Sequence, residues 1–304
     1  DGTPCCTYIG ENGAGHYVKM VHNGIEYADM QLIAEAYLVL KHIGKFNNQE
    51  IGKIFEEYQK GELSSFLIRI TSEIFQEMDD MSTQSLVDMI KDSAQQKGTG
   101  RWTNMEALKQ GIDVSMIAAA GNARLMSNKE TRKTAEEHYP RIKIAKIPNH
   151  ETLIEDVRKS LYAAKIIAYA QGFDLLKQAS TAYDWNLPLG KIASIFRAGC
   201  IIQAKFLNDI TRAYEHEKNL SHLLLDEVFE KRVISYENAL RQIAAQAMLS
   251  GIPVPAMANA ISYLDLFTKN HVGANLIQAQ RDYFGAHTFE RIDKDGSFHH
   301  EWGK

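Results

Sequence analysis

The sequence predicts an all-α protein, and two observations carry that prediction. Apolar residues recur at helical spacing over most of the 304 residues, and no series of alternating β-branched residues indicates a sheet. Turn residues interrupt this pattern without forming a long flexible linker. From ordinary helix lengths we expect about 10 to 15 helices.

The helical pattern is continuous over several stretches, taken here in chain order. The clearest cover residues 15–37, 63–75, 153–176, 192–210, 220–248 and 256–267. Turn signals separate them at residues 47–48, 95–104, 140, 148, 185–190 and 251–255. The simplest partition is one helical domain, 1–280, and a C-terminal tail, 281–304. The tail is aromatic, lacks helical periodicity, and carries Phe284 and Trp302, which favour docking on another surface.

Charge and composition exclude several classes of partner. The formal net charge is -4 and the pI about 6.3, which gives no support to nucleic acid or an anionic membrane as a partner. No apolar run reaches the roughly 18 residues of a membrane span, and residues 1–10 lack the pattern of a signal peptide. Cys5, Cys6 and Cys200 have no metal-type spacing and indicate reduced thiols. We therefore expect a cytoplasmic protein.

The helix predicted at residues 15–37 has two organised faces. An apolar stripe contains Val21, Ile25, Ala28, Leu32 and Val39. The opposite stripe places Lys19, His22, Asn23 and Glu26 at positions i, i+3, i+4 and i+7, with Tyr27 at its edge. The apolar stripe is typical of a core face, and the polar stripe is a candidate site.

Lys19 and Glu26 could act as general base and general acid, if desolvation lowers the pKa of Lys19 toward neutrality, where its amine can accept a proton. The alternative is a solvated helix face with a loose ion pair. Gly24 costs the helix roughly 1 kcal/mol relative to alanine, which indicates that another group approaches the backbone there. Spacing alone leaves both interpretations open.

Basic residues elsewhere suggest an anion site. Residues 97–101, KGTGR, combine cations, the hydroxyl of Thr99 and free backbone N–H groups, which suit a phosphate but also an ordinary solvated turn. Arg124 could reach into a cleft or lie on the surface, and Arg281 and His287 are individually weak candidates. The tail matches neither a calcium loop nor a zinc site, so we expect no metal.

Four long segments resemble decarboxylating 6-phosphogluconate dehydrogenase. They are residues 13–37, 96–103, 196–204 and 274–291. These segments are distributed from residue 13 to residue 291. The resemblance therefore covers nearly the whole chain and is specific. The chain departs from the family pattern at Phe196, Ala198 and Gln203, where the family usually has tryptophan, glycine and arginine.

The resemblance implies a role for each candidate residue. Lys19 would be the base that takes the proton of the substrate's 3-hydroxyl, and Glu26 the acid that protonates the enediol. His22 and Asn23 would hold the substrate's carboxylate and hydroxyls, with Asn23 also near the nicotinamide. The phosphate-binding set would be Tyr27, Lys97, Thr99 and Arg124. Arg281 and His287 would enter the active site of the other subunit of a homodimer.

The resemblance also implies NADP as coenzyme, bound mainly by an N-terminal Rossmann domain. The 304 residues contain no such domain, so we expect them to form the substrate-binding and dimerisation half, which would be inactive alone. A non-catalytic helical dimerisation module is the alternative, although it gives no reason to keep the polar stripe. A dehydrogenase for small hydroxy acids without phosphate is disfavoured by the basic residues.

Overall fold

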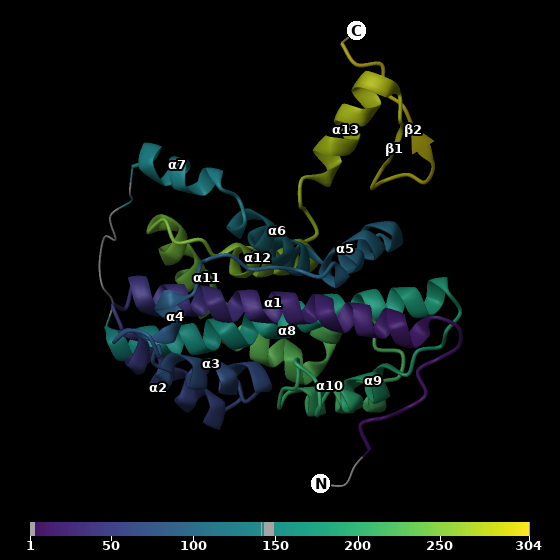
Figure 1. Cartoon of the computed structure of the whole chain (residues 1–304). Coiled ribbons are helices and arrows are strands. Elements are labelled where there is room, and N and C mark those ends of the chain that lie inside the picture. Colours follow the sequence, from purple (N-terminus) through teal and green to yellow (C-terminus); the bar gives the residue numbers. More distant parts are fainter. Residues whose placement is uncertain (1–3, 141, 143–148, 304) are drawn as a thin grey trace. The chain divides into compact units, whose positions relative to one another are not determined.

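The computed structural model describes residues 4–140, 142 and 149–303. Within them the chain forms 13 α-helices, one 3-10 helix and one pair of two-residue strands (Figure 1). The helices are α1 Ala14–His42, α2 Asn48–Lys60, α3 Phe66–Gln76, α4 Leu86–Met89, α5 Thr99–Gln110, α6 Ser115–Ser127, α7 Thr131–His138, α8 His150–Ala182, α9 Leu189–Ile195, α10 Leu207–His216, η1 Leu223–Leu225, α11 Glu227–Leu249, α12 Pro255–Thr268 and α13 Ala274–Gly285. The all-α prediction and the expected number of helices are confirmed.

Two long helices, α1 and α8, form the centre of the helical part (Figure 1). They run antiparallel, since Asp29 meets Lys165 and the earlier Tyr17 meets the later Tyr183. Every residue from 160 to 173 is buried, so α8 is enclosed on all sides. The predicted apolar stripe of α1 is the face that packs here, because Val21, Ile25, Ala28, Leu32 and Val39 are all fully buried.

Several helices begin where the sequence supplies a capping side chain. Asn47 accepts from the N–H of Glu50, whose side chain accepts in turn from the N–H of Asn47, a complete capping box for α2. Ser65, Asn149 and Asp226 cap α3, α8 and α11, because their side chains accept hydrogen bonds from backbone N–H groups of the first turn. These caps explain why α3 and α8 begin near their predicted starts.

The remaining helices surround the central pair. α5 and α6 pack on α1, and α11 packs on α8. α2 packs on α3, and α9 on α10. α5, α6 and the segment after α9 matter most for function, because they border the polar stripe of α1.

The stretch of helical spacing over residues 192–210 does not form one continuous helix. α9 ends at Ile195, and α10 starts at Leu207. Gly199 adopts a left-handed conformation with φ of 69°, which an α-helix does not accommodate. The connection instead makes backbone bonds with the start of α3, including Phe66 N–H to Gln203 O at 2.9 Å. Long-range pairing therefore overrides the local helical pattern.

The chain divides into two compact units, residues 1–261 and 262–304. The second contains the end of α12, α13 and the antiparallel strands β1 Phe289–Glu290 and β2 Ser297–Phe298. The absence of helix predicted from residue 281 onward is wrong at its start, because α13 continues to Gly285. The domain boundary predicted at residue 280 stays a prediction.

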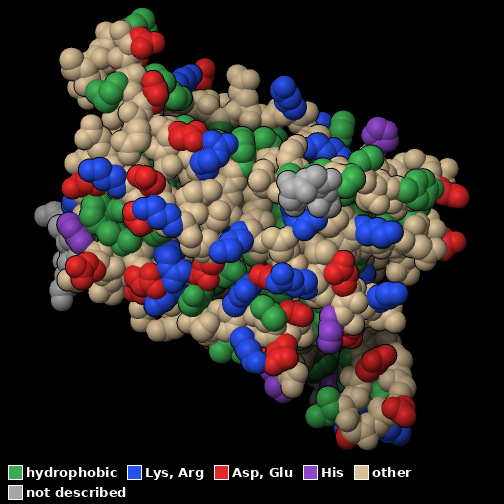
Figure 2. All heavy atoms as spheres, turned by 90° about the horizontal axis from the view of Figure 1, so that it is seen from below, with side chains coloured by type: hydrophobic (Ala, Val, Ile, Leu, Met, Phe, Trp, Pro, Cys, Tyr) green, Lys and Arg blue, Asp and Glu red, His purple; other side chains and the backbone are tan. Residues whose placement is uncertain are grey.

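The distribution of charge on the surface and the polarity of the helices are those of an ordinary globular protein. On the face drawn in Figure 2, Lys and Arg side chains lie interspersed with Asp and Glu, as the small net charge leads one to expect. Among the described residues, none of the helices has both the length and the apolar character needed to cross a membrane.

Candidate active site

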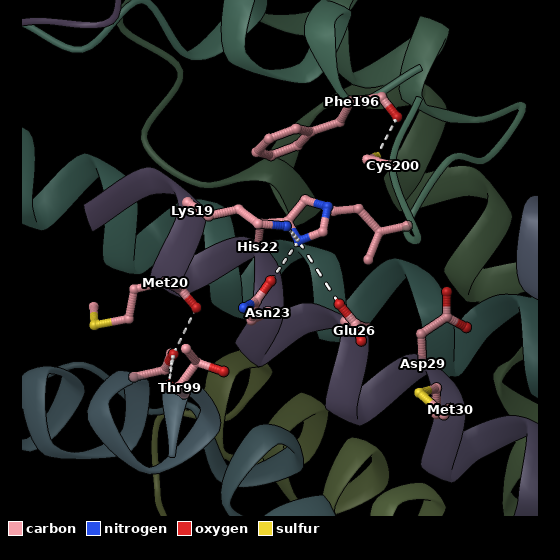
Figure 3. Close-up of polar contacts among 12 residues, drawn as sticks. Lys19, Met20, His22, Asn23, Glu26, Asp29, Met30, Thr99, Phe196 and Cys200 are labelled. Carbon is pink, nitrogen blue, oxygen red and sulfur yellow. Dashed lines mark hydrogen bonds and ion pairs between the residues drawn. The ribbon is translucent and has the colours of Figure 1, made fainter. Parts of the chain in front are cut away.

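The polar stripe of α1 forms one connected cluster. Figure 3 shows Lys19, His22, Asn23 and Glu26 converging around the imidazole of His22. Its Nδ1 lies 3.2 Å from Lys19 Nζ and 3.0 Å from Asn23 Oδ1. Glu26 Oε2 is 3.9 Å from the same nitrogen. The sequence therefore places four functional groups within reach of one small ligand.

His22 Nδ1 cannot serve both of its close neighbours in one tautomer. It accepts when Lys19 Nζ donates, and it must carry a proton when it donates to Asn23 Oδ1. The tautomer of His22 therefore decides which of the two neighbours its Nδ1 serves.

Burial keeps the imidazole neutral. His22 is 1% exposed, and the ring of Phe196 meets it edge to face at 5.1 Å. Desolvation and the nearby charge of Lys19 lower the pKa of His22 to about 4, and the hydrogen bond to Asn23 Oδ1 opposes this shift. Nε2 of His22 is buried without a hydrogen-bond partner among the described residues. A neutral ring with one unused nitrogen suits a ligand hydroxyl.

The carboxyl group of Glu26 is half-buried. Burial raises its pKa, and the charge of Asp29 adds to that effect. The cations Lys19 and Arg124 act in the opposite direction. The net shift is upward, so a larger fraction of Glu26 is protonated near neutral pH than for a solvated glutamate.

Lys19 itself is exposed in the part of the chain that the structure describes. The sequence argument for a basic Lys19 required that its amine be desolvated. The described residues do not supply that burial. For the amine of Lys19 to be desolvated, a substrate or another protein segment would have to cover it.

A second cluster lies beside the first at Tyr27. The guanidinium of Arg124 stacks on the ring of Tyr27, with Cζ 3.6 Å from the ring centroid. Gly100 of α5 abuts the same ring, since a Cβ there would lie 2.6 Å from Tyr27 Cδ2. Tyr27, Arg124 and the start of α5 are thus brought together from three helices, as the phosphate-site prediction requires.

The predicted loop at residues 97–101 is largely a helix start. Gly98 is left-handed, with φ of 102°, and α5 begins at Thr99. No side chain caps this end, and no acidic residue occupies its first turn. An uncapped helix N-terminus presents backbone N–H groups and the positive end of the helix dipole to an anion. Lys97 lies just before it with an exposed side chain.

Gly24 is the close-approach point that its position in mid-helix predicted. A Cβ at Gly24 would lie 2.6 Å from Thr103 Cγ2 and 2.9 Å from Thr103 Oγ1. The Thr103 hydroxyl reaches across to the carbonyl of Met20 at 2.9 Å. The missing side chain thus lets α5 lie directly against α1, which fixes the cluster at Tyr27 relative to the cluster around His22.

Sequence reasoning missed a buried ion pair behind the site. Lys165 Nζ contacts both oxygens of Asp29, at 2.7 and 2.8 Å, and both side chains are almost fully buried. The hydroxyl of Tyr169 lies 3.3 Å from Asp29 and donates to Ile202 O at 2.8 Å. A lysine within the apolar run of α8 was the available signal. The network links α1 and α8 to the segment that carries Phe196.

Arg281 and His287 lie in the second unit, and both side chains are exposed. Arg281 donates to Gln278 at 3.1 Å, and the His287 ring packs edge to face on Phe284. Their predicted entry into the site of a second subunit stays a prediction.

The chain is similar to a known protein family. The model of the family described as 6-phosphogluconate dehydrogenase, C-terminal domain, matches residues 15–302. The chain belongs to this family. The resemblance carried by the four sequence segments is therefore confirmed.

Relatives of the 6-phosphogluconate dehydrogenase family match the whole chain. The NADP(+)-dependent, decarboxylating enzyme of Bacillus subtilis is 51% identical over 100% of this chain and 65% of the relative. The decarboxylating enzyme of Staphylococcus epidermidis is 49% identical over 99% of this chain and 64% of the relative. The chain thus spans slightly less than two thirds of the length of each relative.

A solved structure shows the same fold. The 6-phosphogluconate dehydrogenase of Plasmodium falciparum matches with a TM-score of 0.96 and 44% identity, over 99% of this chain and 65% of that one. That protein has been described without ligands, with its cofactor NADP+ and with its substrate 6-phosphogluconate.

Proposed function

We propose that this chain supplies the substrate-binding and acid-base half of a decarboxylating 6-phosphogluconate dehydrogenase. The complete protein would convert 6-phosphogluconate to ribulose 5-phosphate and carbon dioxide with reduction of NADP, a step of the pentose phosphate pathway. The observation that carries the proposal is the cluster around His22, which joins a lysine, an amide and a carboxyl group of raised pKa on one helical face.

The chemistry requires two proton transfers, and the cluster offers one group for each. The unprotonated amine of Lys19 takes the proton of the substrate's 3-hydroxyl while a hydride leaves C3. NADP, when bound, supplies the hydride acceptor. The C1–C2 bond then breaks, C1 leaves as carbon dioxide, and the electron pair forms an enediol whose C3 oxygen regains a proton from Lys19. Glu26 then protonates C2 while the C3 hydroxyl returns its proton to Lys19, so that the C3 carbonyl of the product forms.

The remaining residues position the substrate. Neutral His22 and the amide of Asn23 can exchange hydrogen bonds with the hydroxyls and the carboxylate, and the half-buried Asn23 also fits a contact with the nicotinamide. The phosphate would lie among Tyr27, Arg124, Thr99 and the uncapped start of α5, with Lys97 nearby. The positive end of α5 and the Arg124 guanidinium suit a dianion.

A homodimer with exchanged tails completes the proposal. The second unit exposes large apolar side chains, including Leu276, Ile277, Phe284 and Ile292. Clustered exposed apolar residues are typical of a protein interface. In the dimer, Arg281 and His287 of each tail would reach the substrate of the partner subunit.

The test is a pair of substitutions in the complete protein. Lys19→Met removes the base and Glu26→Gln removes the acid, so each should reduce turnover at least about 100-fold, the lower range for general acid-base catalysis. Lys53→Met and Glu56→Gln, at exposed positions of α2, are matched controls. Turnover equal to the parent in either site variant, with folding verified by circular dichroism, would contradict the assigned roles.

A further inference from the structure

One carboxylate organises the tail. Asp282 is fully buried and has four hydrogen-bond partners from later residues of the chain. Its Oδ1 accepts from the N–H of Thr288 at 3.0 Å and contacts His299 Nδ1 at 2.9 Å. Its Oδ2 accepts from the N–H of His300 at 3.0 Å and from Trp302 Nε1 at 2.8 Å. Both ends of the tail are therefore tied to the end of α13.

The same residue holds a strained backbone around His287. Ala286 and Thr288 flank the histidine, and both are left-handed, with φ of 49° and 62°. Non-glycine residues rarely adopt this conformation, and it persists only where surrounding contacts hold the backbone in place. Asp282 fixes both, because its carbonyl accepts from the N–H of Ala286 at 2.9 Å and its carboxylate from that of Thr288.

Arg281 is joined to the same arrangement. Its Nη1 donates to Gln278 Oε1, and Gln278 Nε2 donates to the carbonyl of Thr288. The His287 ring folds back over Gly285, where a Cβ would lie 2.7 Å from Nε2. The guanidinium and the imidazole are therefore both presented from one small, internally bonded structure.

We propose that Asp282 is a positioning residue that presents Arg281 and His287 as a preformed pair for the anionic end of the substrate. The inference rests on the proposed function, and it assigns a role to a residue that does not itself touch the ligand. Preorganisation removes the cost of ordering the tail when substrate binds. Loss of Asp282 should then weaken substrate binding more than it slows the chemistry at Lys19 and Glu26.

The test is Asp282→Asn in the complete protein, because the amide keeps the shape but its nitrogen cannot accept hydrogen bonds. We expect KM for 6-phosphogluconate to rise at least about tenfold, a loss comparable to one charge-assisted hydrogen bond, with a smaller change in kcat. Asp293→Asn is the matched control, since Asp293 is exposed in the same tail and pairs only with Arg291 among the described residues. Its KM should equal that of the parent.

A second substitution separates positioning from general damage to the fold. Glycine accepts a left-handed conformation without strain, so Ala286→Gly added to Asp282→Asn should recover part of the lost affinity. If Asp282→Asn does not fold, Trp302→Phe removes a single donor and should raise KM to a smaller degree. An unchanged KM in Asp282→Asn, or in Trp302→Phe where only that variant folds, overturns the inference. Failure of the parent to bind 6-phosphogluconate would instead overturn the proposed function.

Discussion

Arg124 lies over the ring of Tyr27, with its guanidinium carbon 3.6 Å from the ring centroid. The two residues come from α6 and α1, so the stack joins the helix of the predicted phosphate cluster to the helix of the catalytic cluster. Nη2 of Arg124 contacts Met30 Sδ at 3.4 Å. The other N–H groups of a stacked guanidinium can still form charge-assisted hydrogen bonds with a phosphate.

The stack predicts that Arg124→Lys is not a conservative change. Lysine keeps the charge but loses the planar fork, so the dissociation constant of 6-phosphogluconate in the complete protein should rise about tenfold, equivalent to ~1.4 kcal/mol. Isothermal titration calorimetry measures this directly. Arg212→Lys, at an exposed arginine of α10, serves as control, and equal affinities in the two variants would show that Arg124 makes no bidentate contact.

From the contact between α1 and α5 we predict how a side chain added at Gly24 changes stability. In Gly24→Ala the new Cβ would lie 2.6 Å from Thr103 Cγ2. Overpacking of this kind costs about 1–3 kcal/mol, which exceeds the roughly 1 kcal/mol that alanine gains in a helix. We expect a lower urea midpoint.

Gly15→Ala provides the contrast in the same helix, because nothing lies within 4 Å of the added Cβ. It should leave stability unchanged or raise it slightly. Thr103→Ala combined with Gly24→Ala should recover part of the loss. If Gly24→Ala proves as stable as Gly15→Ala, the two helices are not held at this separation.

Because Glu35 is a buried carboxyl group, we expect the stability of the fold to depend on pH. Glu35 is fully buried in α1 and accepts from the N–H groups of Ala256 and Met257 at the start of α12. Burial raises its pKa from 4.5 to about 7, although these bonds and one from Gln31 oppose the rise. The folded state therefore binds more protons than the unfolded state between these values, and stability should fall as pH rises from about 4.5 to 7.

Glu35→Gln removes this titration. The difference in unfolding free energy between parent and variant should change by up to about 3 kcal/mol across that pH range, as measured by urea denaturation at successive pH values. Glu56→Gln, at an exposed position of α2, should show no such change relative to the parent. A pH-independent difference for Glu35→Gln would mean that Glu35 has the same pKa in both states.

The buried pair of Asp29 and Lys165 predicts strong non-additivity. Lys165→Met leaves the Asp29 carboxylate buried without its cation, which should cost about 3–5 kcal/mol. Adding Asp29→Leu removes the uncompensated charge and should restore most of the stability. A double-mutant cycle by urea denaturation measures the coupling, and strictly additive losses would contradict it.

Local pattern determined the fold class and the candidate residues. The 3.6-residue period reveals a helix wherever one face is buried, so α1 and its two stripes could be predicted, as could the close approach at Gly24. The long matching segments likewise indicated the family. The roles of Lys19 and Glu26, in contrast, depend on burial, which no local pattern reports.

Only the tertiary structure decided which distant groups surround these residues. The packing of Phe196 on His22, the pairing of Lys165 with Asp29 and the capping of α12 by Glu35 all join positions far apart in sequence. The break between α9 and α10 has the same origin, since it depends on backbone pairing with α3. Periodicity records which face of a helix is buried, but the partner that buries it is chosen by the packing of the whole chain.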